Sequence, residues 1–267
     1  MNAAARLRER YGPWAVVTGA SDGIGRDFAE RLAEAQVHLV LVARRAEVLE
    51  GLAAELARRH GISTRVLPLD LARPGAVATL ASHTEELDVG LLVAAAGFGT
   101  SGPFLESDPA RELEMVQVNC AAVASLCHAF GKRLVARGRG GLVLMSSLLA
   151  FQGVPRAANY AATKAYVQSL AEGLHLELAP LGVDVLACAP GPVKSGFEAR
   201  ADMQMGMGLP ASTVGRATLA ALGRRTTVRP GWLSKALELA LASLLTRWAR
   251  VRMMAKVMRG MTDHQRA

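Results

Sequence analysis

The segment Trp14–Gln36, WAVVTGASDGIGRDFAERLAEAQ, changes from a strand-like to a helix-like pattern across one short loop. Its first five residues, WAVVT, are mostly apolar and rich in valine, which is typical of a buried strand. The run GIGRDFAERLAEAQ carries apolar residues at helical spacing. The segment therefore predicts a strand, a glycine-rich turn and a helix in direct succession.

The turn TGASDGIG at residues 18–25 is placed to bind an anion. Backbone amides and the positive end of the following helix point at such a loop, where they can receive a pyrophosphate. Gly19, Gly23 and Gly25 would supply the tight turn, the close approach and the helix packing. Their spacing, G-x3-G-x-G, differs from the commoner G-x-G-x-x-G, and a glycine-rich turn can be purely structural. The context of strand, turn and helix favours dinucleotide binding.

Strand-like and helix-like runs alternate along the rest of the chain. The strand-like runs are 37–45, 64–71, 89–97, 140–147, 183–193 and a short one near 226–229; the helix-like runs are 46–61, 74–86, 109–137 and 160–179. Such alternation implies right-handed crossovers and a parallel sheet covered on both faces. We expect an α/β fold: a single doubly wound Rossmann domain over 1–267, with an insert at about 196–213 and a C-terminal helical extension at about 231–260.

Composition narrows the class of protein. Hydrophobic residues make up 51% of the chain and charged residues 20%, so a large core is available. Three cysteines without paired spacing favour a reducing cytoplasm, and six scattered histidines give no metal-ligand pattern. The N-terminus has no apolar signal region, and the apolar runs are shorter than the ~20 residues that span a bilayer. No Gly-x-Ser-x-Gly elbow of a serine hydrolase is present.

The net charge of +8 comes entirely from the C-terminal tail. Residues 224–267 hold ten Lys and Arg against Glu238 and Asp263, whereas the remaining chain has 21 basic and 21 acidic residues. No nucleic-acid-binding module accompanies this charge, so we expect no nucleic-acid partner.

The tail also carries an amphipathic pattern. Its apolar residues recur at steps of three and four: Leu233, Leu237, Leu241, Leu244, Trp248, Val251, Ala255 and Met258. This stripe can pack on the body of the protein, on a second subunit, or on an anionic membrane. Packing on the body or on a subunit is the favoured interpretation, and peripheral membrane contact stays open.

The second strand-like run ends in VARR, which bears on the choice of cofactor. No acidic residue is placed there to hold a ribose 2′-hydroxyl, whereas Arg44 suits a 2′-phosphate. We therefore expect NADP(H) in preference to NAD(H); the alternative is that Arg44 and Arg45 are solvated charges at the end of a strand. Asp70, in PLDL, either accepts from an adenine amino group or caps the following turn.

Tyr160 and Lys164 lie four residues apart at the start of a helix-like run, so both project from one face. An ammonium beside a phenol lowers the phenol pKa from ~10 and makes proton exchange feasible nearer neutrality. The same spacing occurs by chance on many helices.

In combination, TGASDGIG and YAATK, about 135 residues apart, resemble the classical short-chain dehydrogenase/reductase family. Ser147 lies thirteen residues before Tyr160, as the catalytic serine of that family does. Asn119 in VQVNCAA, the turn PGPVKS at 190–195 and the pair Asp70-Leu71 match further family motifs. The resemblance covers residues 14 to about 195.

Two positions depart from the family pattern. The chain reads Ala94-Ala95-Ala96-Gly97 where the family has Asn-Asn-Ala-Gly, and Ser195 stands where a threonine is usual. Side-chain hydrogen bonds that support the sheet and the cofactor are therefore expected to be absent at the first site. Gly97 still permits close backbone approach, and Ser195 keeps a hydroxyl.

The resemblance implies roles for individual residues. Tyr160 would donate the proton to a carbonyl oxygen, Ser147 would polarise that oxygen, and Lys164 would hold the nicotinamide ribose. Asn119 would position a water in a proton relay. The cofactor-binding residues implied are Gly19, Ser21, Asp22, Gly23, Ile24, Gly25, Arg44, Asp70, Leu71, Ala94, Ala96, Gly97, Tyr160, Lys164, Pro190, Gly191, Val193 and Ser195.

The function so predicted is NADPH-dependent reduction of an apolar ketone or 3-oxoacyl substrate by a homo-oligomer, in the branch that acts on hydroxysteroids and 3-oxoacyl thioesters. The alternatives are a non-catalytic NADP(H)-binding regulator and a membrane-peripheral protein on the same fold. In the insert, Met203, Met205 and Met207 suit either a mobile lid over an apolar substrate or a surface loop that packs on the body.

Overall fold

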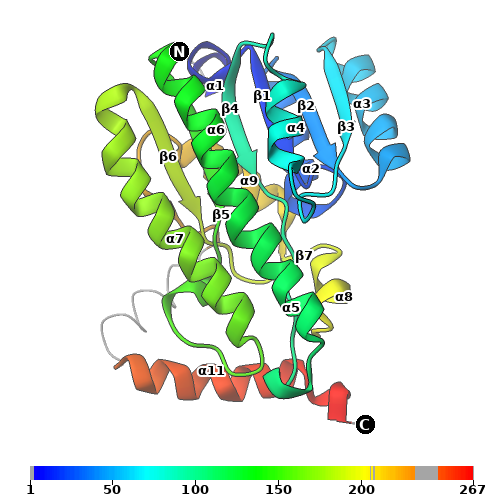
Figure 1. Ribbon diagram of the computed structural model, residues 1–267, viewed down its shortest axis with the longest axis vertical. Coiled ribbons are helices and arrows are strands. Elements are labelled where there is room, and N and C mark those ends of the chain that lie inside the picture. Colours follow the sequence, from blue (N-terminus) through cyan, green and yellow to red (C-terminus); the bar gives the residue numbers. More distant parts are fainter. Residues whose placement is uncertain (1–2, 205, 207, 232–245, 267) are drawn as a thin grey trace.

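A seven-stranded parallel sheet with helices on both faces forms the body of the protein (Figure 1). The computed structural model describes residues 3–204, 206, 208–231 and 246–266. The strands are β1 (Trp14–Thr18), β2 (His38–Ala43), β3 (Thr64–Pro68), β4 (Val89–Ala94), β5 (Gly140–Met145), β6 (Val183–Cys188) and β9 (Thr227–Val228), in the order β3-β2-β1-β4-β5-β6-β9. This confirms the doubly wound Rossmann-like sheet.

The helices follow the predicted alternation. They are α1 (Ala3–Tyr11), α2 (Gly23–Glu34), α3 (Ala46–His60), α4 (Ala76–Ser82), α5 (Pro109–Val116), α6 (Ala122–Arg137), α7 (Ala158–Leu178), α8 (Phe197–Ala201), α9 (Ala211–Ala221) and α11 (Arg247–Met261). Shorter turns are η1 (Phe104–Glu106), η2 (Gln117–Ala121), η3 (Leu148–Phe151), η4 (Ala179–Leu181) and η5 (Asp263–Arg266). β7 (Val193–Lys194), directly before the insert, pairs with β8 (Leu209–Pro210) inside it.

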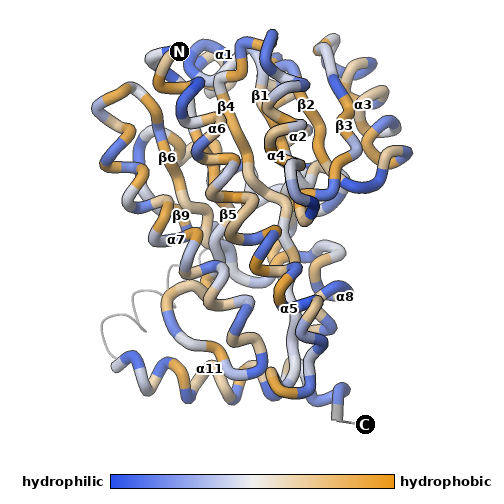
Figure 2. The backbone as a smooth tube through the Cα atoms, in the orientation of Figure 1, coloured by the Kyte–Doolittle hydropathy of each residue, from blue (hydrophilic) through white to orange (hydrophobic). Residues whose placement is uncertain are grey.

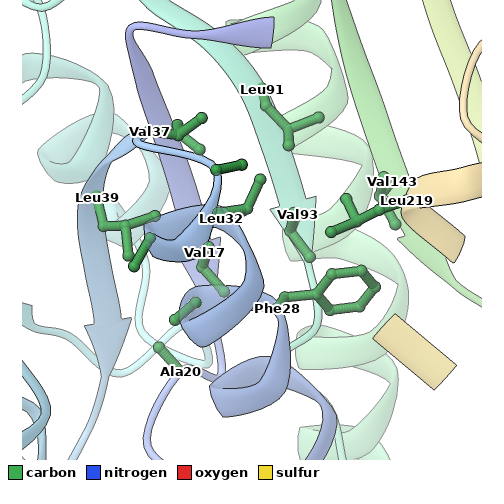
Figure 3. Close-up of a cluster of buried hydrophobic side chains, with 14 of the residues drawn as sticks. Val17, Ala20, Phe28, Leu32, Val37, Leu39, Leu91, Val93, Val143 and Leu219 are labelled. Atoms are coloured by element: carbon green, nitrogen blue, oxygen red, sulfur yellow. The ribbon is translucent and has the colours of Figure 1, made fainter. Parts of the chain in front are cut away.

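The core lies on both faces of the sheet because the central strands are apolar along their whole length (Figure 2). Helices α1, α2, α3 and α9 pack on one face, and α4, α6 and α7 on the other. The ring of Phe28, from α2, lies among Val93, Val143 and Leu219 (Figure 3). This packing fixes α2, and with it the glycine turn that precedes the helix.

The order of the strands reverses between β1 and β4. Crossovers leave in opposite directions from this switch point, so the loops after the two strands diverge and open a crevice at the carboxyl edge. The glycine turn follows β1, and the Ala94–Gly97 stretch follows β4. The two segments expected to approach a dinucleotide are therefore neighbours.

The sequence prediction missed helix α1. Leu7 and Tyr11 are buried against the sheet, and the Tyr11 hydroxyl donates to Asp184 Oδ2 at 2.8 Å. The segment AAARLRERY is mostly charged and small, with too few apolar residues for the helical period to stand out.

The predicted helix over 109–137 is one continuous helical stretch with a π-type turn at η2, where Asn119 lies. Such turns often occur at functional sites. By length and composition alone this stretch could cross a membrane. Its α6 part packs on β4 and β5, and the buried apolar residues of that part belong to the core.

Helix α11 crosses beneath the carboxyl ends of the strands (Figure 1). Met258 is 1% exposed and packs with Met254, Met261 and Tyr160. This part of the predicted stripe therefore packs on the body, as favoured, whereas Trp248 is 62% exposed. The stripe residues Leu233, Leu237, Leu241 and Leu244 lie outside the described residues.

Candidate active site

Two adjoining cavities open at the carboxyl edge of the sheet. A groove of about 220 Å³ runs along the glycine turn and the ends of β2, β3 and β4. A cavity of about 450 Å³ lies under β5 and β6 and above α11. The cavities share Ile24, Ala95, Gly97, Ser195 and Phe197 in their walls. A ligand can therefore extend from one into the other.

The glycine turn forms a cradle that side chains would fill. Gly19 has a φ of 69°, and a Cβ there would lie 2.8 Å from the amide nitrogen of Ala96. Gly23 has a φ of 54°, and its Cβ would lie 2.8 Å from that of Ser195. A Cβ on Gly25 would collide with the carbonyl of Gly19. These contacts require glycine for the tight packing of the turn, and the same three glycines line the groove at the start of α2, which fits a dinucleotide pyrophosphate.

The two arginines after β2 have different surroundings. Arg44 is 65% exposed at the groove, and its ion pair with Glu114 is long, at 3.8 Å. The Arg45 guanidinium donates to Ser21 at both the backbone carbonyl and the hydroxyl oxygen, each at 3.1 Å. Arg45, which the sequence analysis left out of the site, therefore holds the glycine turn, while Arg44 stays available to a ligand.

Most of the other predicted cofactor-binding residues line the groove, and Ala94 does not. Ser21, Asp22, Asp70, Leu71, Ala96 and Gly97 all line the groove. Asp70 Oδ1 also accepts from the amide of Ala72 at 3.1 Å, so the turn-capping alternative is realised beside the groove. Ala94 is buried within β4 and lines neither cavity. Asp22 binds Arg200 of the insert at 3.2 Å, a bridge across the groove that the sequence did not indicate.

Thr18 and Asn119 hold the loop after β4, in which alanines stand where the family has asparagines. The Thr18 hydroxyl accepts from the amide of Ala96 at 3.1 Å and lies 3.4 Å from the carbonyl of Val93. Asn119 brackets Phe98: its Oδ1 accepts from the Phe98 amide at 3.2 Å, and its Nδ2 donates to the Phe98 carbonyl at 2.9 Å. The missing asparagine side chains are thus replaced by bonds from β1 and η2.

Asn119 itself does not line either cavity. It is almost completely buried, and its Nδ2 also donates to the Thr163 hydroxyl at 3.1 Å. These bonds assign Asn119 to positioning the loop after β4 and the helix that carries Tyr160. The expected water in a proton relay stays a prediction.

Ser147, Tyr160 and Lys164 come together in the larger cavity. Ser147 follows β5, and its Oγ accepts from the amide of Leu149 at 3.1 Å. Tyr160 and Lys164 lie one turn apart on α7, and the Lys164 Nζ is 5.8 Å from the centre of the tyrosine ring. Lys164 donates to the carbonyl of Met145 at 2.8 Å, which fixes its ammonium beneath the end of β5.

The pKa of Tyr160 in the structure differs from the value expected from the sequence. Burial raises the pKa of the Tyr160 phenol to about 12, and a hydrogen bond with Ser147 acts in the opposite direction. Burial also lowers the pKa of Lys164 to about 8. The predicted lowering of the phenol pKa from ~10 is therefore wrong for this structure, in which burial is the largest influence on Tyr160. A phenol that stays protonated at neutral pH is suited to donate a proton.

The wall of the larger cavity is mostly apolar. The predicted residues Pro190, Gly191, Val193 and Ser195 line it, together with Met203 of the insert. Met203 is buried, whereas Met205 and Met207 lie outside the described residues. Closure of the insert as a lid stays a prediction, and hydrogen exchange with and without NADPH would test it.

Sequence reasoning did not place α11 in the site. Its side chains Arg250, Met253, Met254, Val257, Met258 and Met261 close the larger cavity, and Arg229, directly after β9, lines it as well. The amphipathic period of the tail was the available signal, but the period alone does not say which surface the stripe covers.

The chain is similar to proteins of known family. A family model described as short chain dehydrogenase matches residues 13–205. A 7beta-hydroxysteroid dehydrogenase of Clostridium sardiniense is 36% identical over 185 residues, which are 69% of this chain and 71% of that protein. A very-long-chain 3-oxoacyl-CoA reductase of Podospora anserina is 37% identical over 181 residues, which are 66% of this chain and 53% of that protein.

Solved structures share the whole fold. A structure from a study of 7beta-hydroxysteroid dehydrogenase stereoselectivity aligns with a TM-score of 0.87 at 26% identity, covering 93% of this chain and 98% of the other. A short-chain dehydrogenase from Sphingobium yanoikuyae in complex with NADPH aligns with a TM-score of 0.78 at 30% identity, covering 88% and 96%.

Proposed function

Since this chain belongs to the short-chain dehydrogenase family and is an oxidoreductase acting on CH–OH groups, we propose that it is an NADPH-dependent reductase of a large apolar ketone. One observation carries the proposal: Ser147, Tyr160 and Lys164 meet where the glycine-turn groove joins an apolar cavity of about 450 Å³. The non-catalytic alternative is not favoured, because all three side chains are present and gathered.

The proposed chemistry assigns one task to each side chain. The cofactor supplies the hydride when it is bound. Tyr160 donates its phenolic proton to the carbonyl oxygen of the substrate, and Ser147 donates a hydrogen bond to the same oxygen. Lys164 holds the nicotinamide ribose, and Ser195 holds the carboxamide. The apolar walls exclude water from the reacting carbonyl, which strengthens both hydrogen bonds.

The preference for NADPH rests on Arg44. Its exposed guanidinium lies at the groove after β2, where a 2′-phosphate would need a positive charge. The family as a whole uses NAD(P), and the preference within it is our proposal. Relatives named for 7beta-hydroxysteroids and very-long-chain 3-oxoacyl-CoA support a large apolar carbonyl compound as the substrate class.

The proposal is tested with a panel of carbonyl compounds and NADPH consumption as the readout. Oxosteroids and long-chain 3-oxoacyl thioesters should be reduced with a higher kcat/KM than small ketones such as acetone, because only large substrates fill the cavity. Exclusive turnover of small polar carbonyls, or no turnover of any member, would contradict the proposed substrate class.

The reaction direction should depend on pH. Alcohol oxidation needs the Tyr160 phenolate, whose fraction grows about tenfold per pH unit below a pKa of about 12. Oxidation rates should therefore rise from pH 7 to pH 10. Reduction needs the phenol, the dominant form throughout, so its rate should not rise. Initial rates in both directions, at saturating cofactor, measure this; oxidation that is flat with pH would contradict the role of Tyr160.

Assembly and location belong to the same proposal. We expect a cytoplasmic homo-oligomer, supported by apolar side chains exposed on α5 and α7, namely Leu113, Val116, Tyr166 and Leu176. Peripheral membrane contact would use Trp248, whose ring has the Arg252 guanidinium 3.7 Å from its centre. Sedimentation of the full chain without vesicles measures the oligomeric state, and a monomer would contradict the expected homo-oligomer. Sedimentation with anionic vesicles measures membrane contact, and a chain that stays in solution would contradict it.

A further inference from the structure

The larger cavity contains two guanidinium groups among apolar side chains. Arg229 and Arg250 line it, and no carboxylate is found among the described lining residues. Its other cation, Lys164, is bonded to Met145 at the catalytic end. Guanidinium groups are costly in apolar surroundings unless an anion or hydrogen-bond acceptors compensate them. This composition is unexpected for a cavity that binds only an uncharged apolar molecule.

Arg250 carries the argument because one of its donors is unsatisfied. Its Nε is buried, and no acceptor within the described parts of the chain reaches it. A buried donor without a partner costs about 1–3 kcal/mol, so such atoms usually mark a place where a further group binds. Arg250 lies in the first turn of α11, where its own backbone amide bonds to Thr246.

Arg229 contributes a second charge from another element. It follows β9, and its guanidinium carbon lies 3.9 Å from the centre of the Phe151 ring, which holds the group in place. The negative charge of Glu172 acts on Arg229. Arg229 is therefore partly compensated, whereas Arg250 supplies the unsatisfied donor.

The two ends of the cavity are separated along α11. Met258 packs in the cluster that contains Tyr160, and Arg250 precedes Met258 by eight residues on the same helix. At a rise of 1.5 Å per residue, this separation is about 12 Å. A substrate whose carbonyl lies at Tyr160, beside Met258, would therefore need an apolar body of roughly that length to reach Arg250 along the methionines of α11 that line the cavity.

We propose that the substrate is an amphipathic carbonyl compound with an anionic group at the end remote from the reacting carbonyl, and that Arg250, aided by Arg229, binds this anion. The inference rests on the proposed reductase function and narrows its substrate class. A carboxylate, a sulfate or a phosphate would all satisfy the guanidinium, since each accepts charge-assisted, paired hydrogen bonds.

Two matched pairs of probes test the proposal and separate the sources of the anion. The first is a 7-oxosteroid with a side-chain carboxylate, compared with its methyl ester. The second is a long-chain ketone with a terminal phosphate, compared with the uncharged dimethyl ester of that phosphate. In at least one pair the anionic member should have a kcat/KM about 10- to 150-fold higher, the range of one charge-assisted hydrogen bond. Equal values in both pairs would overturn the proposal.

Variants show whether Arg250 is responsible. In Arg250→Met the ratio between the anionic and neutral members should fall to near unity, and Arg250→Lys should restore part of it. Arg247→Met is the matched control: Arg247 is exposed on the same helix and does not line the cavity, so its loss should leave the ratio intact. A ratio that survives in a folded Arg250→Met, or falls equally in Arg247→Met, would refute the assignment.

Failure of the reductase function would be visible separately. Calorimetric binding of both probe pairs to the full chain with NADP⁺, which cannot reduce the ketone, requires no turnover. Absence of reduction with preferential binding of an anionic member would contradict the proposed function and support the anion site. Reduction with equal binding of the two members in both pairs would support the proposed function and contradict the anion site.

Discussion

Replacing Tyr160 with phenylalanine should lower carbonyl reduction by about a thousandfold, within the range of 10²–10⁴ that general acid catalysis contributes. The ring and its packing against Phe197, with a centroid distance of 5.3 Å, are retained, so only the proton donor is lost. NADPH binding, followed by cofactor fluorescence, should persist because the glycine turn and Arg44 are untouched. Single-turnover reduction of the best ketone of the panel gives the rate.

Tyr166→Phe is the control for this experiment. Tyr166 is on the same helix, is 43% exposed and lies outside both cavities, so the same chemical change should leave the rate within about twofold, as expected for a surface position. If Tyr160→Phe also reduced ketones at nearly the normal rate, Tyr160 would not be the acid.

The second large effect is expected on the preference between NADPH and NADH. Arg44→Asp removes the positive charge from the groove and places a carboxylate where we expect the 2′-phosphate. The loss of a charge-assisted bond corresponds to about 10- to 150-fold, and repulsion adds to it, so kcat/KM for NADPH should fall by about 100-fold or more. The carboxylate can instead accept from a ribose 2′-hydroxyl, so kcat/KM for NADH should not fall.

Arg58→Asp is the control for this experiment, because it changes the net charge of the protein by the same amount as Arg44→Asp. Arg58 is exposed on α3, away from the groove, so its substitution should shift neither cofactor constant by more than about twofold. The decisive measurement is titration of both cofactors against the unmodified chain and the two variants. If the unmodified chain bound NADH at least as tightly as NADPH, the role of Arg44 would be wrong.

The sequence was sufficient to predict the sheet and the order of its elements. Continuous apolar runs such as β2 and β5 are too apolar for a strand with one solvent-exposed face, so they indicate strands that are buried on both faces. Each of these runs is followed by a segment with helical spacing of its apolar residues. The glycine positions were predictable for the same local reason: the positive φ of Gly19 and Gly23 is a backbone property set within the turn. The resemblance to the family was confirmed as well.

Contacts between distant segments were less predictable. The alanines after β4, which replace asparagines of the family, indicated that this loop lacks side-chain hydrogen bonds. In the structure, Thr18 and Asn119 supply hydrogen bonds to the loop from elsewhere in the chain. The identity of Asn119 was visible in the sequence, but its partners depend on how η2 lies against the loop. Likewise Arg44 and Arg45 are equivalent in sequence, and only the fold directs Arg45 to Ser21.

The sequence by itself determined the parallel sheet, the glycine-rich turn after β1 and the chemical types available for proton transfer, because these depend on local backbone freedom and on periodicity. Only the tertiary structure decided that the pKa of Tyr160 is raised and that α11 closes the cavity with Arg250 in its wall. Desolvation is a sum over every group that surrounds an atom. The surroundings of Tyr160 come from α5, α7, the insert and α11, segments more than a hundred residues apart at their extremes, so no local sequence pattern predicts the pKa shift.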